Sequence, residues 1–397
     1  MIRVALIGDF PSRPDRLGGG VQAAFVYLVR GLVEIDDLEV HVLTFGDPAA
    51  DATLPPPVPG ATFHHLPPFR RFEFARDFRS YQRAIDTVLA IIEPDVVHAQ
   101  GATDHAYVAL RTGLPVVITV HGVQGEDRRH QPTLATRLRK RLYAATIERS
   151  NLRHTRYLIA IGRYVTDYFA QVLAPDVRVF RIANAVDASF FGLDHRPSGG
   201  RVLFAGRVNR RKRPLDLVRA FARVAPLVPQ AELRLAGDLL GEPDTVAELR
   251  RSIVDLGLSD RVQLLGSLAE AEVLAEFAQA DLLVLPSGQE TTPMVIAQAM
   301  AVGLPVVATD VGGVAEMVEV DRTGLLVEVG DVDGLAAAMA RILNEPATAA
   351  AMGAAGRAVA LASYTQAAVS AATADVYRTM AREAESKAVT ERTGPPA

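Results

Sequence analysis

The chain has 397 residues, 49% of them hydrophobic, and it contains no cysteine. This length predicts two or three domains, each large enough to bury an ordinary core. The absence of thiols excludes disulfide scaffolds, thiolate metal sites and cysteine nucleophiles, and it is compatible with a reducing cytoplasm. The formal net charge of -4 argues against a general nucleic-acid-binding protein.

No segment resembles a membrane-spanning helix, because no apolar run approaches about 18 uninterrupted residues. Residues 1–8 look like a first strand that leads directly into a loop, without the cleavage site of a secretory leader. We therefore expect a cytoplasmic protein, or one attached peripherally to the inner face of the membrane.

The first half of the chain alternates short runs rich in Val, Ile and Leu with longer helical patterns. The predicted strands are residues 2–8, 39–44, 95–98, 116–121 and 157–162. A helix is expected at residues 21–35, and the proline-rich stretch 47–60 is expected to be a loop. This alternation is typical of β-α-β units in a parallel sheet.

A second series of strands follows the weakly structured stretch 194–200. Its predicted strands are residues 201–206, 232–237, 261–266, 281–287 and 305–310. Strands that are apolar on both faces are expected where helices cover both sides of a sheet. The sequence therefore predicts an α/β protein with two doubly wound domains, which bind ligands at the carboxyl ends of their strands.

The end of the chain divides into a helical part and a polar tail. Residues 363–383 have the apolar spacing of a helix, whereas the polar stretch 386–397 is predicted to be disordered. The predicted division is a first domain at residues 1–190, a second domain at 191–365, a helix at about 366–385 that packs back on the first domain, and a disordered tail at 386–397.

A basic segment, residues 206–214, follows the first strand of the second series and carries five cations and no acid. Arg207 offers a planar fork for phosphate oxygens, and Lys212 offers a mobile point charge. These two side chains could clamp a pyrophosphate. A solvated basic turn is the alternative.

Residues 287–294 lead from a strand end into a helix whose first helical position is expected at Pro293. The free amides of its first turn would form a site for an anion or for sugar hydroxyls, and Glu290 could accept hydrogen bonds from a hexose. An ordinary carboxylate at a helix start is the alternative for Glu290.

Three glycines, residues 18–20, stand between the first strand and the first helix. They permit close backbone approach to a phosphate, or they form a flexible loop. The chain has neither the dinucleotide-binding Gly-x-Gly-x-x-Gly pattern at this point nor a P-loop motif. The sequence therefore lacks the motif that would best indicate a dinucleotide-dependent dehydrogenase or a P-loop nucleotide-binding protein.

His121 ends a predicted strand and could donate a hydrogen bond to a substrate at the same edge of the sheet. A lone histidine is more often structural, and His98 is the candidate for that role. The pair Asp331 and Asp333 precedes a predicted helix and is interpreted as a cap rather than a metal site. No obligatory metal is therefore expected.

Taken in this order, the segments resemble the retaining glycosyltransferases of the GT-B fold, specifically glycosyltransferase family four. The most specific stretch is residues 290–316, which follows the helix, strand and turn of the family signature. Supporting matches are residues 18–20, 94–98, 119–121 and 184–187, and Gly206 and Arg207 with Lys212. The resemblance covers nearly the whole chain.

The resemblance implies two Rossmann-like domains that face a central cleft, the first binding the acceptor and the second the donor. It implies a metal-independent enzyme that moves a hexose-type sugar from a nucleotide-diphosphate sugar to a hydroxyl-bearing acceptor. The nucleotide sugar is a co-substrate, and no obligatory cofactor is expected.

The family pattern also implies roles for individual residues. Arg207 and Lys212 would bind the donor diphosphate, and Glu290 would contact the donor sugar. The pattern places His121 near the donor hexose. The remaining donor contacts would come from the backbone of Gly19 and Gly20, the amides of Thr291, Thr292 and Met294, a base-binding loop around Leu268, and Gln298.

Two departures from the family pattern affect the expected site. Gln298 replaces the second signature glutamate, which usually binds ribose hydroxyls, and Thr291 with Thr292 replaces a Gly-aromatic pair. An amide lacks the charge-assisted hydrogen bond of a carboxylate, which is about twice as strong. Gln298 thus leaves open a non-catalytic nucleotide-sugar-binding protein, and a GT-B nucleotide-sugar epimerase is a further alternative.

The stretch from Arg128 to Arg156 holds nine Arg or Lys residues and one acid, Glu148. A basic helix of this kind fits an anionic membrane surface or a lipid-diphosphate acceptor. A solvated face is the alternative.

Overall fold

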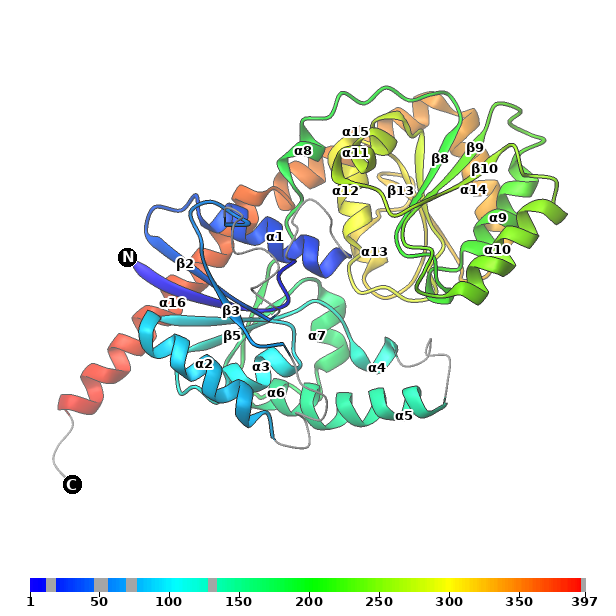
Figure 1. Ribbon diagram of the computed structural model, residues 1–397. Helices are drawn as coiled ribbons and strands as arrows, with labels where there is room; N and C mark the ends of the chain where they lie inside the picture. Colours follow the sequence, from blue (N-terminus) through cyan, green and yellow to red (C-terminus); the bar gives the residue numbers. More distant parts are fainter. Residues whose placement is uncertain (12–18, 46–55, 69–76, 128–133, 394–397) are drawn as a thin grey trace. The chain divides into compact units, whose positions relative to one another are not determined.

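The computed structural model describes residues 1–11, 19–45, 56–68, 77–127 and 134–393. These residues form two compact α/β units (Figure 1). Unit 1 comprises the described residues of Met1–Pro14, Val21–Ala185 and Gln366–Ala397, and unit 2 comprises those of Asp15–Gly20 and Val186–Thr365.

Unit 1 is built on a parallel seven-stranded sheet with the order β3-β2-β1-β4-β5-β6-β7. Its strands are β1 (Ile2–Ile7), β2 (Leu38–Phe45), β3 (Thr62–Leu66), β4 (Val96–Gln100), β5 (Val116–Val120), β6 (Tyr157–Ala160) and β7 (Arg178–Arg181). In the centre of the sheet, Val4 pairs with Val40 on one side and Val96 on the other. Such runs of buried β-branched residues are typical of a parallel sheet covered on both faces.

Helices cover both faces of this sheet. They are α1 (Gly20–Leu32), α2 (Arg79–Ile92), α3 (Asp104–Ala109), α4 (Gln124–Asp127), α5 (Leu134–Tyr143), the π-helix η4 (Ala144–Glu148), α6 (Arg149–His154), α7 (Arg163–Phe169) and α16 (Gln366–Thr393). On one face, Ile85 of α2 and Phe169 of α7 join the core formed by Val97 and Ile118. Full burial of side chains of this size stabilises the fold by about 1.5–3 kcal/mol each. Helices α1 and α16 lie on the other face.

Helix α16 belongs to unit 1 although it lies at the far end of the sequence. Its Arg378 forms two hydrogen bonds of 2.6 and 2.8 Å with the carboxylate of Asp37, and Tyr157 donates to Glu383 at 2.6 Å. The sequence predicts disorder from residue 386, but the helix continues through Thr393. Lys, Ala, Glu and Arg in this stretch favour a helix even without an apolar face. Residues 394–397 lie outside the described part.

Unit 2 is built on a parallel six-stranded sheet with the order β10-β9-β8-β11-β12-β13. Its strands are β8 (Arg201–Ala205), β9 (Glu232–Ala236), β10 (Val262–Gly266), β11 (Leu282–Leu285), β12 (Val306–Thr309) and β13 (Gly324–Val327). Its helices are α8 (Ala188–Phe191), the 3-10 turn η5 (Arg210–Lys212), α9 (Pro214–Val224), α10 (Pro243–Asp255), α11 (Glu270–Gln279), α12 (Met294–Val302), α13 (Val314–Met317), α14 (Val332–Asn344) and α15 (Pro346–Ser363).

The first six strands of each unit have the same order in their sheet, and β7 adds a seventh strand at the edge in unit 1. The order reverses between β1 and β4 in unit 1, and between β8 and β11 in unit 2. In doubly wound sheets ligands bind beside the carboxyl ends of the strands at such a reversal. The loops after β8 and β11 are therefore the first place to look for a site in unit 2.

The α/β class with two parallel sheets is confirmed, and so are the predicted strands. The sequence did not predict β3, β7 and β13, which are all edge strands. β3 (TFHHL) and β7 (RVFR) lack the continuous apolar run of a central strand, because edge strands are covered less completely. β13 (GLLV) is apolar, so its composition does not explain why it was missed. Only part of the predicted loop 47–60 lies within the described residues, at 56–60, which contain neither helix nor strand.

Candidate active site

The basic loop after β8 folds into a defined turn. The Asn209 side chain accepts a hydrogen bond from the Lys212 backbone amide at 3.0 Å and so caps η5. Arg213 then adopts a left-handed conformation with φ of 49°, and Pro214 begins α9. This turn directs Lys212 inward, where the residue is only 8% exposed. Lys212 is therefore buried, and the alternative of a solvated basic turn does not apply to this residue.

The loop after β11 is attached to this basic loop by backbone contacts. The Gly288 amide donates to the Arg211 carbonyl at 2.7 Å, and the Arg211 guanidinium donates to the Gln289 carbonyl at 2.7 Å. The two loops that follow the strands at the reversal of the sheet thus form one structure.

Glu290 lies at the centre of this structure and is buried. Its Oε1 lies 2.6 Å from Nζ of Lys212, and its Oε2 lies 3.2 Å from a guanidinium nitrogen of Arg211. Burial alone would raise the pKa of Glu290, but the charges of Lys212 and Arg211 outweigh burial and hold this pKa below its ordinary value. Burial lowers the pKa of Lys212, and Glu290 opposes that change. Glu290 is therefore a buried, compensated carboxylate rather than an exposed one at a helix start.

The start of α12 differs from the predicted one by one residue. Pro293 is the N-cap, with ψ of 119°, and the helix begins at Met294. The chain enters from an extended segment, so the proline sits just before the first turn instead of within it. Thr291 is buried, and the Thr292 hydroxyl is buried without a hydrogen-bond partner in the described residues. A buried hydroxyl without a partner is uncommon in folded proteins.

Gly313 lets the turn after β12 pack against this loop. A Cβ added at Gly313 would lie 2.0 Å from the Thr291 carbonyl oxygen, far inside van der Waals contact. The turn at residues 310–316 therefore supports Thr291 and its neighbours only because residue 313 is glycine.

The other predicted donor residues fall into two groups. Gly19 and Gly20 are part of unit 2. A Cβ added at Gly19 would lie 3.4 Å from a side-chain nitrogen of Arg207, and a Cβ added at Gly20 would lie 3.3 Å from Cγ of Met294. Gly19 is therefore close to Arg207, and Gly20 is close to Met294. Leu268 and Gln298 are both half-buried. Leu268 follows β10, which β9 separates from β8, and Gln298 lies in α12. Gly18 lies outside the described residues.

Arg211 was not predicted as a site residue. The sequence shows five cations in this loop, but it does not show which of them the 3-10 turn directs toward Glu290. Arg213, in contrast, pairs with Asp216, its Nε lying 2.6 Å from a carboxylate oxygen.

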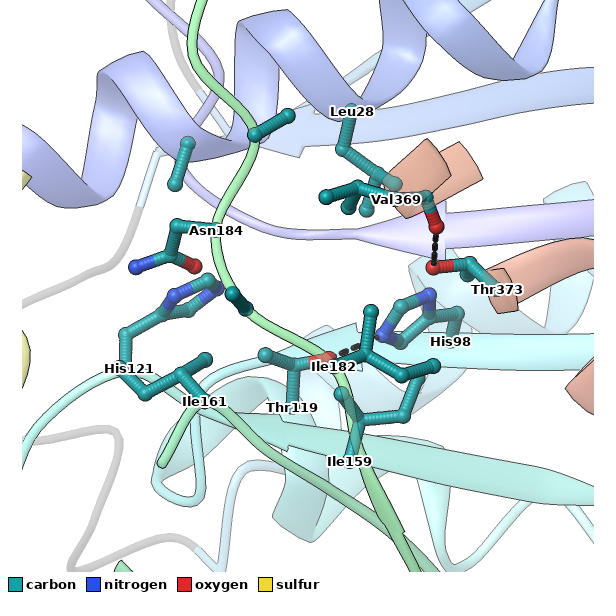
Figure 2. Close-up of a pocket in the computed structure, with 13 residues that line it drawn as sticks. Leu28, His98, Thr119, His121, Ile159, Ile161, Ile182, Asn184, Val369 and Thr373 are labelled. Atoms are coloured by element: carbon teal, nitrogen blue, oxygen red, sulfur yellow. Dashed lines mark hydrogen bonds between the residues drawn. The ribbon is translucent and has the colours of Figure 1, made fainter. Parts of the chain in front are cut away.

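His121 belongs to unit 1, where it follows β5. Its Nε2 lies 2.8 Å from Oε1 of Gln100, and burial lowers its pKa to about 4, an effect that Asn184 opposes. His98 is fully buried, and its ring contacts the hydroxyls of Tyr377 and Thr119. His121 also lines a pocket of about 20 Å³, room for about one water molecule (Figure 2).

A second polar group of unit 1 lies beyond the carboxyl end of β4, at the start of α3. Asp104 has a buried Oδ1 without a hydrogen-bond partner in the described residues, and burial raises its pKa to about 6. No sequence pattern singles out Asp104, because a carboxylate in the first turn of a helix is ordinary.

The expected helix cap at Asp331 is confirmed, since its side chain accepts from the Gly334 amide at 2.8 Å. Within the described residues, no group of three or more acids and histidines is placed to hold a metal ion. No helix in the same part of the chain is long and apolar enough to cross a membrane.

The paired Rossmann-type sheets and the buried acid-cation cluster define a glycosyltransferase of the GT-B class. A model for glycosyl transferases group 1 matches residues 187–359, and a model for glycosyltransferase family 4 matches residues 18–190. The chain belongs to this family of glycosyltransferases, so the predicted family and enzyme class are confirmed.

Individual relatives agree with this assignment. The chain is 30% identical to a glycogen synthase of Mycobacterium tuberculosis, over 72% of this chain and 68% of the relative. It is 29% identical to a D-inositol 3-phosphate glycosyltransferase of Streptosporangium roseum, over 94% of this chain and 92% of the relative.

Solved structures share the fold at lower identity. Sucrose-phosphate synthase from Thermosynechococcus elongatus superposes with a TM-score of 0.78 at 23% identity, over 96% of this chain and 99% of that one. Anabaena Alr3699/HepE in complex with UDP-glucose superposes with a TM-score of 0.74 at 21% identity, over 96% and 100%. At these identities the likeness establishes the fold.

Proposed function

We propose that the protein is a retaining glycosyltransferase that moves a hexose-type sugar from a nucleotide-diphosphate sugar to a hydroxyl-bearing acceptor, without an obligatory metal. The observation that carries the proposal is the buried contact of Glu290 with Lys212 and Arg211 at the strand reversal of unit 2. The UDP-glucose bound to Alr3699/HepE, which has the same fold, supports a nucleotide sugar as the donor.

The carboxylate and the cations would act on opposite parts of the donor. Glu290 accepts hydrogen bonds from sugar hydroxyls, while Lys212 and Arg207 offset the charge that develops on the leaving diphosphate. Glu290 already holds Lys212 in position, so little reorganisation is needed at the moment of reaction. Loss of one such preorganised donor typically lowers the rate about a hundredfold.

The proposed reaction is a front-face substitution. The bond from the anomeric carbon to the diphosphate oxygen breaks while the acceptor oxygen forms a new bond to the same face of that carbon. The departing diphosphate takes the proton of the acceptor hydroxyl. The configuration at the anomeric carbon is therefore retained.

Further residues around these side chains would also contact the donor. The backbone of Gly19 and Gly20 would face the phosphate, and the amides and hydroxyls at Thr291, Thr292 and Met294 would hold sugar and phosphate. Leu268 and Gln298 would lie near the base and the ribose. Unit 1 would bind the acceptor, where Asp104 offers an unpaired carboxyl oxygen to a hydroxyl.

Product stereochemistry tests this proposal. The enzyme is incubated with α-linked nucleotide sugars and a panel of glycan, lipid-linked and small-molecule acceptors, and the anomeric proton coupling of the product is measured by NMR. We expect an α-linked product, and none from Glu290→Ala, with normal turnover by the exposed control Glu248→Ala. A β-linked product contradicts the retaining mechanism.

Gln298 favours one alternative, a protein that binds nucleotide sugars without transferring them. Donor binding without turnover on every acceptor would support this alternative. An epimerase would release an altered or free sugar in the absence of any acceptor, which the same NMR experiment detects.

We also propose that α5 contacts an anionic membrane surface, where a lipid-linked acceptor would lie. Three leucines recur every fourth residue on this helix and are 82%, 54% and 57% exposed: Leu134, Leu138 and Leu142. The helix has no acid and four cations: Arg137, Arg139, Lys140 and Arg141. An apolar stripe beside cations fits the boundary between lipid headgroups and acyl chains. Residues 128–133 of the predicted basic stretch lie outside the described part.

Co-sedimentation with vesicles tests the membrane contact. We expect binding to vesicles that contain phosphatidylglycerol and little binding to phosphatidylcholine vesicles. Leu138→Gln should weaken that binding, whereas Leu240→Gln, which changes an exposed leucine of unit 2, should not. Equal binding to both kinds of vesicle would exclude the proposed surface.

A further inference from the structure

The helix at residues 134–154 of unit 1 contains a π-turn. Helices α5 and α6 join through η4 without a break, and the residues on either side of η4, Tyr143 and Arg149, keep right-handed helical dihedral angles. A π-turn bonds residue i to residue i+5 instead of i+4, so it places one extra residue in the helix. Such turns are rare and frequently lie at functional sites.

The extra residue turns the two ends of this helix toward different sides. Leu152 lies about five whole turns beyond Leu134, at 3.6 residues per turn, so an uninterrupted α-helix would place both on one side. Leu134 is exposed, however, and Leu152 is fully buried. One extra residue rotates the helix that follows it by about 100°. The π-turn therefore allows α5 to expose its leucines while α6 buries a different face.

The buried face carries two polar residues, Glu148 at the end of η4 and Asn151 in α6, which are 2% and 3% exposed. Oε1 of Glu148 accepts a hydrogen bond of 3.0 Å from the Gln124 amide. Nδ2 of Asn151 donates to the carbonyls of Ala102 and Thr103 at 2.9 and 2.8 Å, which uses both of its hydrogens. Buried polar groups destabilise a fold unless they are hydrogen-bonded, and these contacts meet that requirement through loop backbone.

The two loops held in this way follow neighbouring strands. The β4 loop is residues 101–103, and the β5 loop is residues 121–124. Gln100 of β4 pairs with Thr119 of β5, and the Gly101 amide donates to the Thr119 carbonyl at 2.8 Å. The loops therefore leave the sheet side by side at its carboxyl edge, where doubly wound sheets bind ligands. Glu148 and Asn151 fix the spacing between them.

Each loop has a glycine that borders open space. A Cβ added at Gly101 or at Gly122 would meet no described atom within 4 Å. Gly101 has φ of 112°, a conformation that glycine adopts without strain. Gly122 has no positive φ, so its backbone would accept another residue. A side chain there would cover backbone that a ligand can otherwise approach closely.

We propose that Glu148 and Asn151 are positioning residues, which hold the β4 loop and the β5 loop so that a hydroxyl-bearing ring of the acceptor binds against the backbone at Gly101 and Gly122. The part that concerns the acceptor rests on the proposed function. All four residues belong to unit 1. A ring with several hydroxyls suits such a surface, because hydroxyls can both donate to backbone carbonyls and accept from backbone amides.

Simple polyols test the surface without any donor. The backbone amides are followed by ¹H–¹⁵N NMR while D-glucose, maltose or myo-inositol is added to the full chain. We expect at least one of these probes to shift the amides of Gly101 and Gly122 in a saturable way. Gly113 is an internal control, since it also borders open space but precedes β5, at the amino edge of the sheet. No saturable shift with any probe, or equal shifts at Gly113, would overturn the proposal.

Gly122→Leu fills the proposed acceptor space. Because the added Cβ meets no described atom, Tm should stay unchanged. The polyol-induced shift at Gly101 should disappear, and the KM for the acceptor should rise about 10–100-fold, the usual effect of forcing extra side-chain atoms into filled space. Gly192→Leu is the matched control, at an exposed glycine of unit 2 that also lacks a positive φ, and it should change neither value. An unchanged acceptor KM in Gly122→Leu contradicts the proposal.

Two substitutions of Glu148 test its positioning role. The Gln124 amide needs an oxygen acceptor, which Glu148→Gln keeps and Glu148→Met removes at similar length. Glu148→Met should raise the acceptor KM about three- to tenfold, the usual effect of one hydrogen bond, and leave donor affinity unchanged. Glu148→Gln should behave like the unmodified protein. Equal acceptor KM values in the two variants would exclude the role.

Asn151→Leu tests the other loop, because leucine has a similar branched shape but no donor for the Ala102 and Thr103 carbonyls. It should also raise the acceptor KM and leave donor affinity unchanged. If polyols shift the two glycine amides but no sugar is transferred, the acceptor surface stands and the proposed function fails. If sugar is transferred while Gly122→Leu and Glu148→Met leave the acceptor KM unchanged, the acceptor does not bind at these loops.

Discussion

Nζ of Lys212 lies 2.6 Å from Oε1 of Glu290, although the two residues come from loops that follow different strands of unit 2. Each residue is less than one-tenth exposed. Removing Glu290 leaves Lys212 and Arg211 without their shared counter-charge, and removing Lys212 leaves the buried Glu290 with Arg211 alone.

We therefore expect the two residues to be energetically coupled. Glu290→Gln should lower the free energy of unfolding by about 3 kcal/mol, because it leaves buried cations facing a neutral amide. Lys212→Met should also be destabilising. The double variant should lose at least about 1 kcal/mol less than the sum of the two single losses. Urea unfolding measures these values, and strictly additive losses would contradict the coupling.

Arg211 should matter for catalysis although the sequence did not single it out. Arg211→Ala removes contacts with Glu290 and with the Gln289 carbonyl, and should lower kcat/KM about 10–100-fold. Arg210 is its matched control, since it is adjacent and exposed, and Arg210→Ala should change kcat/KM by less than about twofold. Equal effects of the two substitutions would contradict the assigned role of Arg211.

Asp104 should make stability depend on pH. Its pKa in the folded protein is about 6, above the ordinary 3.8, so the folded state favours the protonated form. Its contribution to stability is then complete below about pH 4 and is lost as the pH rises through 6, by about 2 kcal/mol. Asp104→Asn should remove this dependence in denaturation curves at pH 4 and pH 7.5, whereas Asp86→Asn, at an exposed position of α2, should keep it.

Gln298 should limit donor affinity. Gln298→Glu restores a carboxylate one turn into α12, and a charge-assisted hydrogen bond to a ribose hydroxyl should tighten donor binding about three- to tenfold. Gln230→Glu adds the same charge at an exposed position of unit 2 and should have no such effect. Calorimetric titration measures both variants, and weaker binding by Gln298→Glu would place Gln298 away from the ribose.

The sequence predicted the strands in the middle of each sheet because their runs of Val, Ile and Leu are continuous. It missed β3 and β7 for the opposite reason, since these edge strands contain charged and polar residues. The edge strand β13 was missed although its sequence is apolar. The end of α16 was missed because a polar helix and a disordered tail have similar compositions.

The candidate site was likewise predictable from the sequence only in part. Lys212 and Glu290 could be predicted, because the family pattern and the strand ends point to them. Their contact with each other, and with Arg211, depends on the turn that Asn209 caps. The contact of His98 with Tyr377 joins residues 279 apart and follows from the packing of α16, which no local pattern encodes.

The most direct test of the donor site is binding of nucleotide sugars, measured by saturation-transfer NMR on a panel of UDP-, GDP- and ADP-sugars. We expect selective binding of one class, which is lost in both Arg207→Ala and Glu290→Ala and kept in the exposed control Glu248→Ala. Unchanged binding in Glu290→Ala, or no binding of any donor by the unmodified protein, would contradict the assignment of this cluster as the donor site.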